Sequence, residues 1–393
     1  MIKKQNKKPI SDLYGIIFPI FVMIISFLLI YLYVNVYHSS DYPAHVRQAL
    51  RGEGYSLVSL MVVLLHKIDA SNTLFIAFMA IATAVTVYAC AFFIRTVMEL
   101  LGKDCDQKTL IPIAASTVFI CKLCIPEWSG YYYQGAFATQ SWHNSTYTLM
   151  RLFAILTLGF YFSIEREYKE TIDIKKLALF TLSLALSNLS KPNFVIVFAP
   201  IMLVRLIIDF VSSKGKNFRN AFIFGCCVLV SCVVLIFQFR TSFPGEGESG
   251  VAFSVSNAIA FLTKDKKLPL YLLLNYAFPI YVSYLVYFKS GRKKVLNRRI
   301  ITESWMMVLF SILVYMFIVE TGPRAADGNF GWGMPFFGYL IFAVCIGYLE
   351  TMHKEGRISD EQYLAGKILY FAHIFFGIFY FGLLLLGYLS WGF

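Results

Sequence analysis

An acid and an imidazole four positions apart are the residues best suited to chemistry. Asp41 follows the first long apolar segment, in the stretch His38-Ser-Ser-Asp41-Tyr-Pro-Ala-His45. If the residues after Asp41 are helical, His45 lies one turn later on the same side of the helix. Asp41 could then act as a general base that removes a hydroxyl proton from an attacking acceptor, while His45 orients the carboxylate or the substrate. Asp at this position is also typical of a helix N-cap, so a catalytic and a capping role both stay open.

Three basic residues could stabilise a phosphate. Lys191 falls in a break of a few residues between two apolar segments, Arg324 follows Gly-Pro in a polar loop, and Arg151 lies about one turn inside an apolar segment. Ammonium and guanidinium groups pair well with phosphate oxygens. The alternatives are that Lys191 and Arg151 snorkel towards headgroups, and that Arg324 forms a surface ion pair with Glu320 or Asp327.

Aromatic, imidazole and amide side chains near these residues could bind a sugar. Ring faces together with hydrogen-bonding groups are the mixture that a sugar-binding surface needs, although an aromatic belt at a membrane interface would supply similar rings. The candidate substrate-binding residues are Trp142, His143, Asn144, Glu320, Asp327 and Asn329.

The elements that must position these residues are apolar helices. Of the 393 residues 58% are hydrophobic and only 15% are charged, which is too apolar for a soluble enzyme. Segments long enough to cross a bilayer as helices recur along the chain. We predict an all-α, polytopic transmembrane helical bundle of about eleven spans, near residues 13–37, 74–97, 110–125, 146–163, 175–190, 194–210, 220–239, 269–288, 302–320, 333–349 and 367–390.

Two shorter apolar stretches, 57–68 and 251–262, are below spanning length and are expected to be short interfacial or re-entrant helices on the outer face. No repeat or long hydrophilic stretch divides the chain, so residues 1–393 are expected to form one membrane domain. Its candidate site is expected to be built from the outer segments near residues 38–69, 126–145, 191–193, 240–268 and 320–332.

The positive charge of the chain is best explained by topology. The formal net charge is +12, and most of the 35 Lys and Arg fall in loops on one side if the N-terminus is cytoplasmic. Short cytoplasmic loops retain such cations, which also contact anionic membrane lipids. A nucleic-acid partner is therefore unnecessary.

The stretch Ser40-Asp41-Tyr42-Pro43-Ala44-His45, followed by a short interfacial helix and many spans, resembles the integral-membrane glycosyltransferases of the GT-C class. The resemblance is architectural and covers most of the chain. Its Trp-His-Asn, Lys-Pro and Gly-Pro-Arg elements are similar to bacterial envelope members of that class. The adjacent acids common in the class are absent, since His45 is the nearest ionisable partner of Asp41, and this leaves any divalent metal open.

The resemblance implies an activity. Such enzymes take a sugar from a polyprenyl-phosphate donor, on the extracytoplasmic face of the bacterial cytoplasmic membrane, and generally invert the anomeric carbon. The acceptor here would be an envelope glycan, lipid or protein. Asp41 would be the base, and Lys191, Arg324 and Arg151 would stabilise the leaving phosphate.

Two other functions fit many of the same residues. A polysaccharide polymerase or ligase would also need an outer cationic pocket for a lipid diphosphate. A transporter or flippase of a lipid-linked glycan would explain the spans and the cations without chemistry. Transporters tend to place ionisable groups near the bilayer midplane in matching halves, whereas here these residues gather at span ends and no duplicated halves are visible, which favours an enzyme.

Overall fold

The computed structural model describes residues 13–38, 40–103, 105, 107–123, 143–242, 250–263, 268–289, 297–322, 325 and 328–387. Most of these residues are helical. In chain order the elements are α1 (Leu13–Asn35), α2 (Tyr42–Leu50), α3 (Leu57–His66), α4 (Thr73–Leu100), α5 (Gln107–Ser116), η1 (Thr117–Phe119), α6 (Ser145–Glu167), α7 (Ile174–Ser190), α8 (Asn193–Ser212), α9 (Phe218–Ser242), β1 (Gly250–Phe253), α10 (Val255–Thr263), α11 (Leu268–Asn275), α12 (Ala277–Tyr284), η3 (Leu285–Lys289), α13 (Arg299–Phe317), β2 (Ile318–Thr321), η5 (Asn329–Trp332), α14 (Gly333–Lys354) and α15 (Asp360–Leu385).

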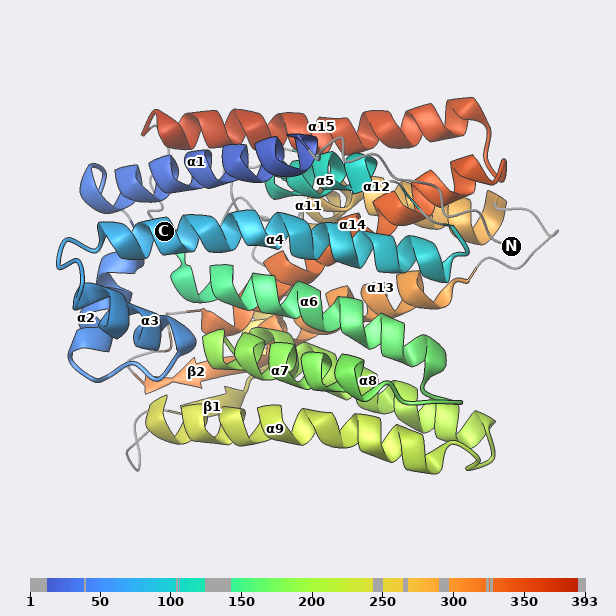
Figure 1. The fold of residues 1–393 in the computed structure, drawn as a ribbon, viewed down its shortest axis with the longest axis horizontal. Coiled ribbons are helices and arrows are strands. Elements are labelled where there is room, and N and C mark those ends of the chain that lie inside the picture. The colour runs from blue at the N-terminus through green and yellow to red at the C-terminus, as the bar shows by residue number, and fades with distance from the viewer. Residues whose placement is uncertain are drawn as a thin grey trace.

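The long helices run side by side as a bundle, with α15 and α1 on one side and α9 on the other (Figure 1). Burial follows this arrangement. Almost every residue of α14 is buried, whereas α9 is exposed along most of its length. A helix that exposes apolar side chains all along its length is stable only in a lipid environment. The chain is therefore an all-α membrane protein with α14 at its centre.

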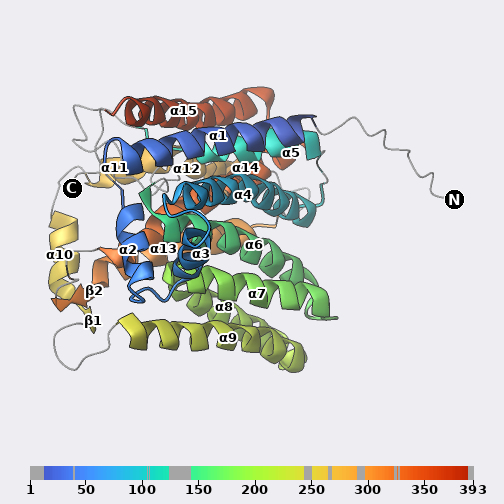
Figure 2. The same cartoon turned by 60° about the vertical axis from the view of Figure 1, so that its left-hand side comes forward.

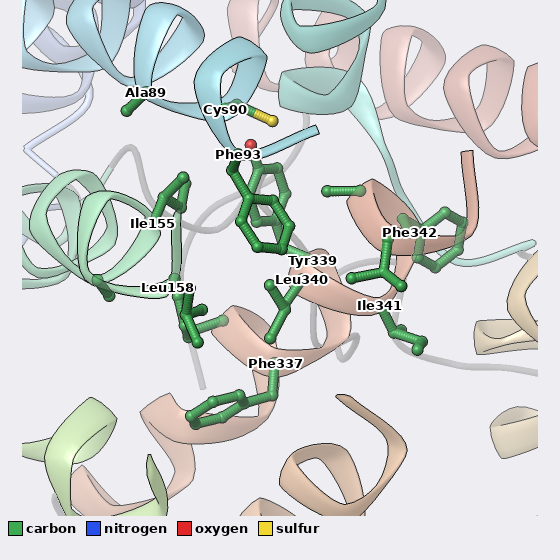
Figure 3. Close-up of a cluster of buried hydrophobic side chains, with 14 of the residues drawn as sticks. Ala89, Cys90, Phe93, Ile155, Leu158, Phe337, Tyr339, Leu340, Ile341 and Phe342 are labelled. Carbon is green, nitrogen blue, oxygen red and sulfur yellow. The ribbon is translucent and has the colours of Figure 1, made fainter. Parts of the chain in front are cut away.

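The core around α14 is packed by aromatic and branched side chains. Tyr339 and Leu340 of α14 meet Phe93 of α4 and Leu158 of α6 (Figure 3). A Cβ at Gly159 would lie 2.4 Å from the ring of Phe92, so this glycine lets α4 and α6 approach closely. Tight packing holds α6 firmly, and α6 carries groups of the candidate site at its first turn.

The expected count of eleven spans is not confirmed. Within the described residues eight helices are long and apolar enough to cross a membrane, or nine if α11 and the helix after it form one span bent by 69°. The other two expected spans are short: α7 has 17 residues, and α5, which contains Pro112, has 10. The chain after η1 turns extended at Ile120, so the expected helix over 110–125 ends early.

Two strands were not predicted. The helix expected over 302–320 ends at Phe317, and β2 follows it and pairs antiparallel with β1, with Val251 opposite Glu320. The interfacial helix expected over 251–262 accordingly begins only at Val255. Asn257 accounts for the early end of α13, because its amide donates to the carbonyls of Tyr315 (3.2 Å) and Met316 (2.8 Å), which the helix end leaves free.

The short elements gather at one end of the bundle. There α2 and α3 lie near β1 and β2, and α10 runs across the direction of the long helices (Figure 2). The prediction of a short helix over 57–68 agrees with α3, which begins after a Ser56 N-cap and ends at His66. This end of the bundle holds the candidate site.

Candidate functional site

Asp41 occupies the N-cap position of α2, yet its side chain makes no capping bond. Its carboxylate instead accepts a hydrogen bond from the Asn144 amide (3.0 Å) and lies 3.8 Å from Nε2 of His143. The backbone N–H of Asp41 also donates to the carbonyl of His143 (3.1 Å). The side chain remains 46% exposed. The carboxylate is thus positioned by residues at the start of α6 and does not cap its own helix, α2.

The orientation of Asn144 follows from its role as the N-cap of α6. Its Oδ1 accepts from the backbone N–H of Tyr147 (2.9 Å) and from the hydroxyl of Thr146 (2.7 Å). With Oδ1 engaged, the amide nitrogen is the group that faces Asp41. We call Asp41, His143 and Asn144 the Asp41 cluster.

His45 lies one turn after Asp41 on α2, as the spacing predicts. Its Nδ1 is hydrogen-bonded to the Ser145 hydroxyl (2.8 Å). Burial, helped by the positive charge of Lys191 and opposed by Asp41, lowers the pKa of His45 to about 4. The imidazole is therefore neutral at physiological pH.

Lys191 is the C-cap of α7, in extended backbone just before α8. Its side chain is buried, which does not fit the snorkelling alternative. The ammonium donates to the hydroxyl of Thr146 (3.3 Å) and lies 5.1 Å from the ring centre of Trp332. A buried ammonium beside a hydroxyl and an aromatic face is suited to bind an anion.

Sequence reasoning did not single out Trp332 as a site residue. Its ring centre lies 5.3 Å from that of His143 and 5.1 Å from that of Tyr147, in addition to its contact with Lys191. Trp332 ends η5, directly before α14. Its only signal in the sequence is a lone tryptophan in the Gly-rich stretch Gly-Asn-Phe-Gly-Trp.

A second hydrogen-bonded group ties β2, η5 and α8 together. The Asn329 amide donates to Glu320 (2.8 Å), and the Asn193 amide donates to the carbonyl of Asn329 (2.7 Å). Glu320 and Asn329 were both expected in the site. Asn193 falls within the expected segment 191–193 but was not named as a candidate residue.

A cavity of about 1100 Å³ lies between these groups, and we call it the Lys191 cavity. Its polar lining includes His45, Lys191, Asn193, Glu320 and Asn329. Gln48, Glu53 and Arg240 also line it; they fall within the expected segments 38–69 and 240–268 but were not named as candidate residues. Leu235, Ile236 and Phe239 of α9 supply an apolar wall. The cavity thus extends from the charged residues around Lys191 to α9, the least buried of the candidate spans.

Some expected site residues are elsewhere. Arg151 is fully buried inside the bundle and does not line the Lys191 cavity. Asp41 lies beside the cavity rather than in its lining, which His45 reaches instead. Trp142, Arg324 and Asp327 lie outside the described residues.

No group of three His, Cys, Asp or Glu side chains that could hold a metal ion occurs in the described part of the chain. A divalent metal therefore remains only an implication of the resemblance. The chemistry considered below uses side chains of the protein.

The other end of α6 carries an ion-pair network that sequence reasoning missed. Glu165 and Glu303 pair with Arg299, and Asp209 pairs with Arg205 (2.8 Å) and with Lys169 (3.0 Å). Tyr161 and Tyr168 donate to Glu303 and Asp209. We call this set the Glu165 network. It lies about 30 Å along α6 from the Asp41 cluster.

Comparisons of this chain with protein-family models, with curated proteins and with solved structures found no match. The roles proposed below come from the chain's own residues and from the resemblance of its first outer loop.

Proposed function

We propose that this protein is an integral-membrane glycosyltransferase that moves a sugar from a polyprenyl-phosphate donor to an envelope glycan, lipid or protein. The observation that carries the proposal is an oriented carboxylate, Asp41, beside a cavity that contains a buried cation, Lys191, and a neutral imidazole, His45. A base and an anion-stabilising group on either side of a reacting carbon are what an inverting displacement needs.

The apolar wall of the Lys191 cavity supports a lipid-linked donor. Leu235, Ile236 and Phe239 lie on α9, whose surface is largely exposed and apolar. A polyprenyl chain could lie along this helix while its phosphate contacts the ammonium of Lys191. A donor that arrives attached to a lipid also requires no nucleotide-binding motif.

The proposed reaction is a single displacement. The acceptor hydroxyl gives its proton to Asp41, its oxygen forms a bond to the anomeric carbon, and the bond from that carbon to the phosphate oxygen breaks. The electron pair leaves on the phosphate, whose charge Lys191 stabilises. The Asn144 amide holds the carboxylate of Asp41, and the aromatic ring of Trp332 provides a face for the sugar.

His45 is proposed to assist Asp41 rather than to replace it. The imidazole lines the cavity and is held by Ser145. It can therefore form a hydrogen bond with the hydroxyl group of the sugar acceptor. Its Nδ1 is engaged with the Ser145 hydroxyl, whereas the Asp41 carboxylate is half exposed and oriented by the Asn144 amide. We therefore assign positioning to His45 and proton removal to Asp41.

The orientation proposed for the chain puts the Asp41 cluster outside and the N-terminus in the cytoplasm. The loops and adjoining helix starts near the Glu165 network contain Lys175, Lys176, Lys214, Lys216 and Arg219. Short loops that carry many Lys and Arg residues are retained on the cytoplasmic side of the membrane. The opposite end, with the Lys191 cavity, would then face the periplasm or cell exterior of a bacterial cytoplasmic membrane.

Reconstitution with lipid-linked donors tests this function. The purified protein would be placed in liposomes with a panel of polyprenyl-phosphate sugars and envelope glycan, lipid and peptide acceptors, and products would be detected by mass spectrometry. We expect a glycosylated product from wild type and none from Asp41→Asn. Equal product from both proteins would refute the role of Asp41.

The same liposomes separate transfer from transport. The burial of Arg151 within a spanning helix is the one observation that favours a transporter, because carriers place ionisable groups inside the bilayer. Movement of the lipid-linked sugar between leaflets, measured by its access to an external glycosidase, would show transport. Leaflet exchange without any glycosidic product would contradict the enzymatic proposal.

A further inference from the structure

Arg151 is the most unusual charged residue in the described chain. It lies on α6 with 0% of its surface exposed, and its guanidinium carbon is 5.5 Å from the ring centre of Tyr339. None of its three guanidinium nitrogens has a hydrogen-bond partner among the described residues. Its charge acts on Tyr147, Cys90 and Tyr339, none of which is a carboxylate.

A buried charge without a counter-ion is costly for the folded state. Desolvation of a cation is offset only by pairing and hydrogen bonds, and the contact with Tyr339 supplies just part of that. Other strongly buried charges of the described residues have polar or charged partners, as Asp209 with Arg205 and Lys169 shows. Such an exception is expected where a residue serves a ligand rather than the fold.

A second unpaired donor lies one turn away. The hydroxyl of Tyr147 is buried and has no hydrogen-bond partner in the described part of the chain. Tyr147 and Arg151 are four residues apart on α6, so they occupy the same side of the helix. Both can donate hydrogen bonds, and together they form a set of donors that no described side chain satisfies.

Trp332 connects this pair to the Lys191 cavity. Its indole packs against the ring of Tyr147 at 5.1 Å and also contacts the ammonium of Lys191 at 5.1 Å. Lys191 lines the cavity, whereas Tyr147 and Arg151 do not. The indole therefore contacts both the cavity's cation and the ring of Tyr147.

We propose that Arg151 and Tyr147 form an inner oxyanion site behind Trp332, which takes a phosphate group when the indole moves aside. The planar guanidinium matches two phosphate oxygens, and the phenol hydroxyl can donate to a third. A phosphate that enters from the Lys191 cavity would neutralise Arg151. Entry would give the guanidinium and the phenol hydroxyl acceptors that they lack among the described residues.

The identity of the ligand rests on the proposed function, since the phosphate would be that of the lipid-linked donor. The site itself can be tested without sugar transfer. If the probes bind through Arg151 while no transfer occurs, the proposed function fails and the inner site stands. If transfer depends on Asp41 while Arg151→Met binds the probes normally, the inner site alone fails.

Binding measurements on the full chain in detergent micelles test the inner site. The probes are inorganic diphosphate and farnesyl phosphate, which distinguish a free phosphate from a lipid-linked one. We expect Arg151→Met to weaken binding of the preferred probe at least about tenfold, the loss of one charge-assisted pair. Arg95→Met, which removes an exposed arginine, is the matched control and should bind as wild type does.

Two further variants keep the test decisive if Arg151→Met folds poorly. Tyr147→Phe keeps the ring and removes only the hydroxyl, and should weaken binding by a few-fold. Trp332→Ala should speed probe association in stopped-flow experiments, because the indole no longer blocks entry. Probe affinities within about twofold of wild type in the Arg151 and Tyr147 variants, or no probe binding to wild type, would overturn the inner site.

Discussion

The two ends of α6 are built from the same residue types and differ in how those residues are paired. At the Glu165 end three carboxylates meet three cations, and Asp209 is 3% exposed. At the other end, the carboxylate of Asp41 is 46% exposed and accepts a hydrogen bond only from a neutral amide among the described contacts. The charges of the Glu165 network pair with one another, whereas the Asp41 cluster borders the Lys191 cavity.

This difference separates residues that hold the fold from residues that act on a ligand. Charged groups that already pair with one another have few donors or acceptors left to bind a substrate. A carboxylate that is oriented but partly exposed can still accept a hydrogen bond or a proton from one. The helices joined by the Glu165 network are α6, α8 and α13. All three reach the Lys191 cavity at their other ends, through Thr146, Asn193 and the strand that carries Glu320. The network thus anchors the helices that shape the cavity.

The largest expected effect is on catalysis at Asp41. Asp41→Asn keeps the shape of the side chain and removes the base, so the rate of sugar transfer should fall about 10²- to 10⁴-fold. The melting temperature should stay within a degree or two of wild type, because the side chain is half exposed. A large loss of stability with normal activity per folded molecule would instead place Asp41 among the structural residues.

At the opposite end we expect the reverse result. Asp209→Asn leaves Lys169 without a carboxylate among the described contacts and leaves Arg205 only its longer pair with Glu303 (3.5 Å). The loss of one partner from a buried pair costs about 3–5 kcal/mol. Thermal unfolding in micelles should show a fall of several degrees. Glu99→Gln is the matched control, since its pair with Arg95 is exposed and should contribute less than about 1 kcal/mol.

Lys191→Ala should act mainly on the donor. The loss of one charge-assisted contact to a phosphate is worth about 1.5–3 kcal/mol, so the KM for the donor should rise roughly 10- to 100-fold. The KM for the acceptor should change little. A variant with unchanged donor kinetics would remove Lys191 from the phosphate site.

The smallest expected effect concerns His45 and pH. Its pKa in the folded protein, about 4, is below the value near 6.5 of an unfolded chain. The unfolded chain therefore binds more protons between these pH values, and stability should fall as the pH drops below about 6.5. Between pH 7.5 and 6 the loss should be about 1 kcal/mol at most, and His45→Gln should remove it. Melting curves for both proteins that depend equally on pH would contradict this assignment.

The sequence predicts the helices and the local spacing of the site well. The turn between Asp41 and His45, the break at Lys191 and the short helix after Ser56 all follow from residue types within a few positions. These features depend on local rules of helix periodicity and capping. They need no knowledge of which helices are neighbours.

Features that depend on packing between distant segments were missed. The count of eleven spans is not confirmed, in part because Pro112 and the extended residues after Phe119 shorten one helix. The pairing of β1 with β2 joins residues about 70 positions apart, and Trp332 reaches the site only through the start of α14. Nor could hydropathy show that Arg151 is unpaired, since that depends on the neighbours that α4 and α14 provide.

Single-turnover sugar transfer in liposomes, at equal amounts of folded protein, tests the contrast between the two ends most directly. It would compare wild type with Asp41→Asn and Asp209→Asn, and an active lipid-linked donor would be used. We predict that Asp209→Asn transfers at the wild-type rate per folded molecule, while Asp41→Asn is at least 100-fold slower. Transfer by Asp41→Asn at the wild-type rate would contradict the account.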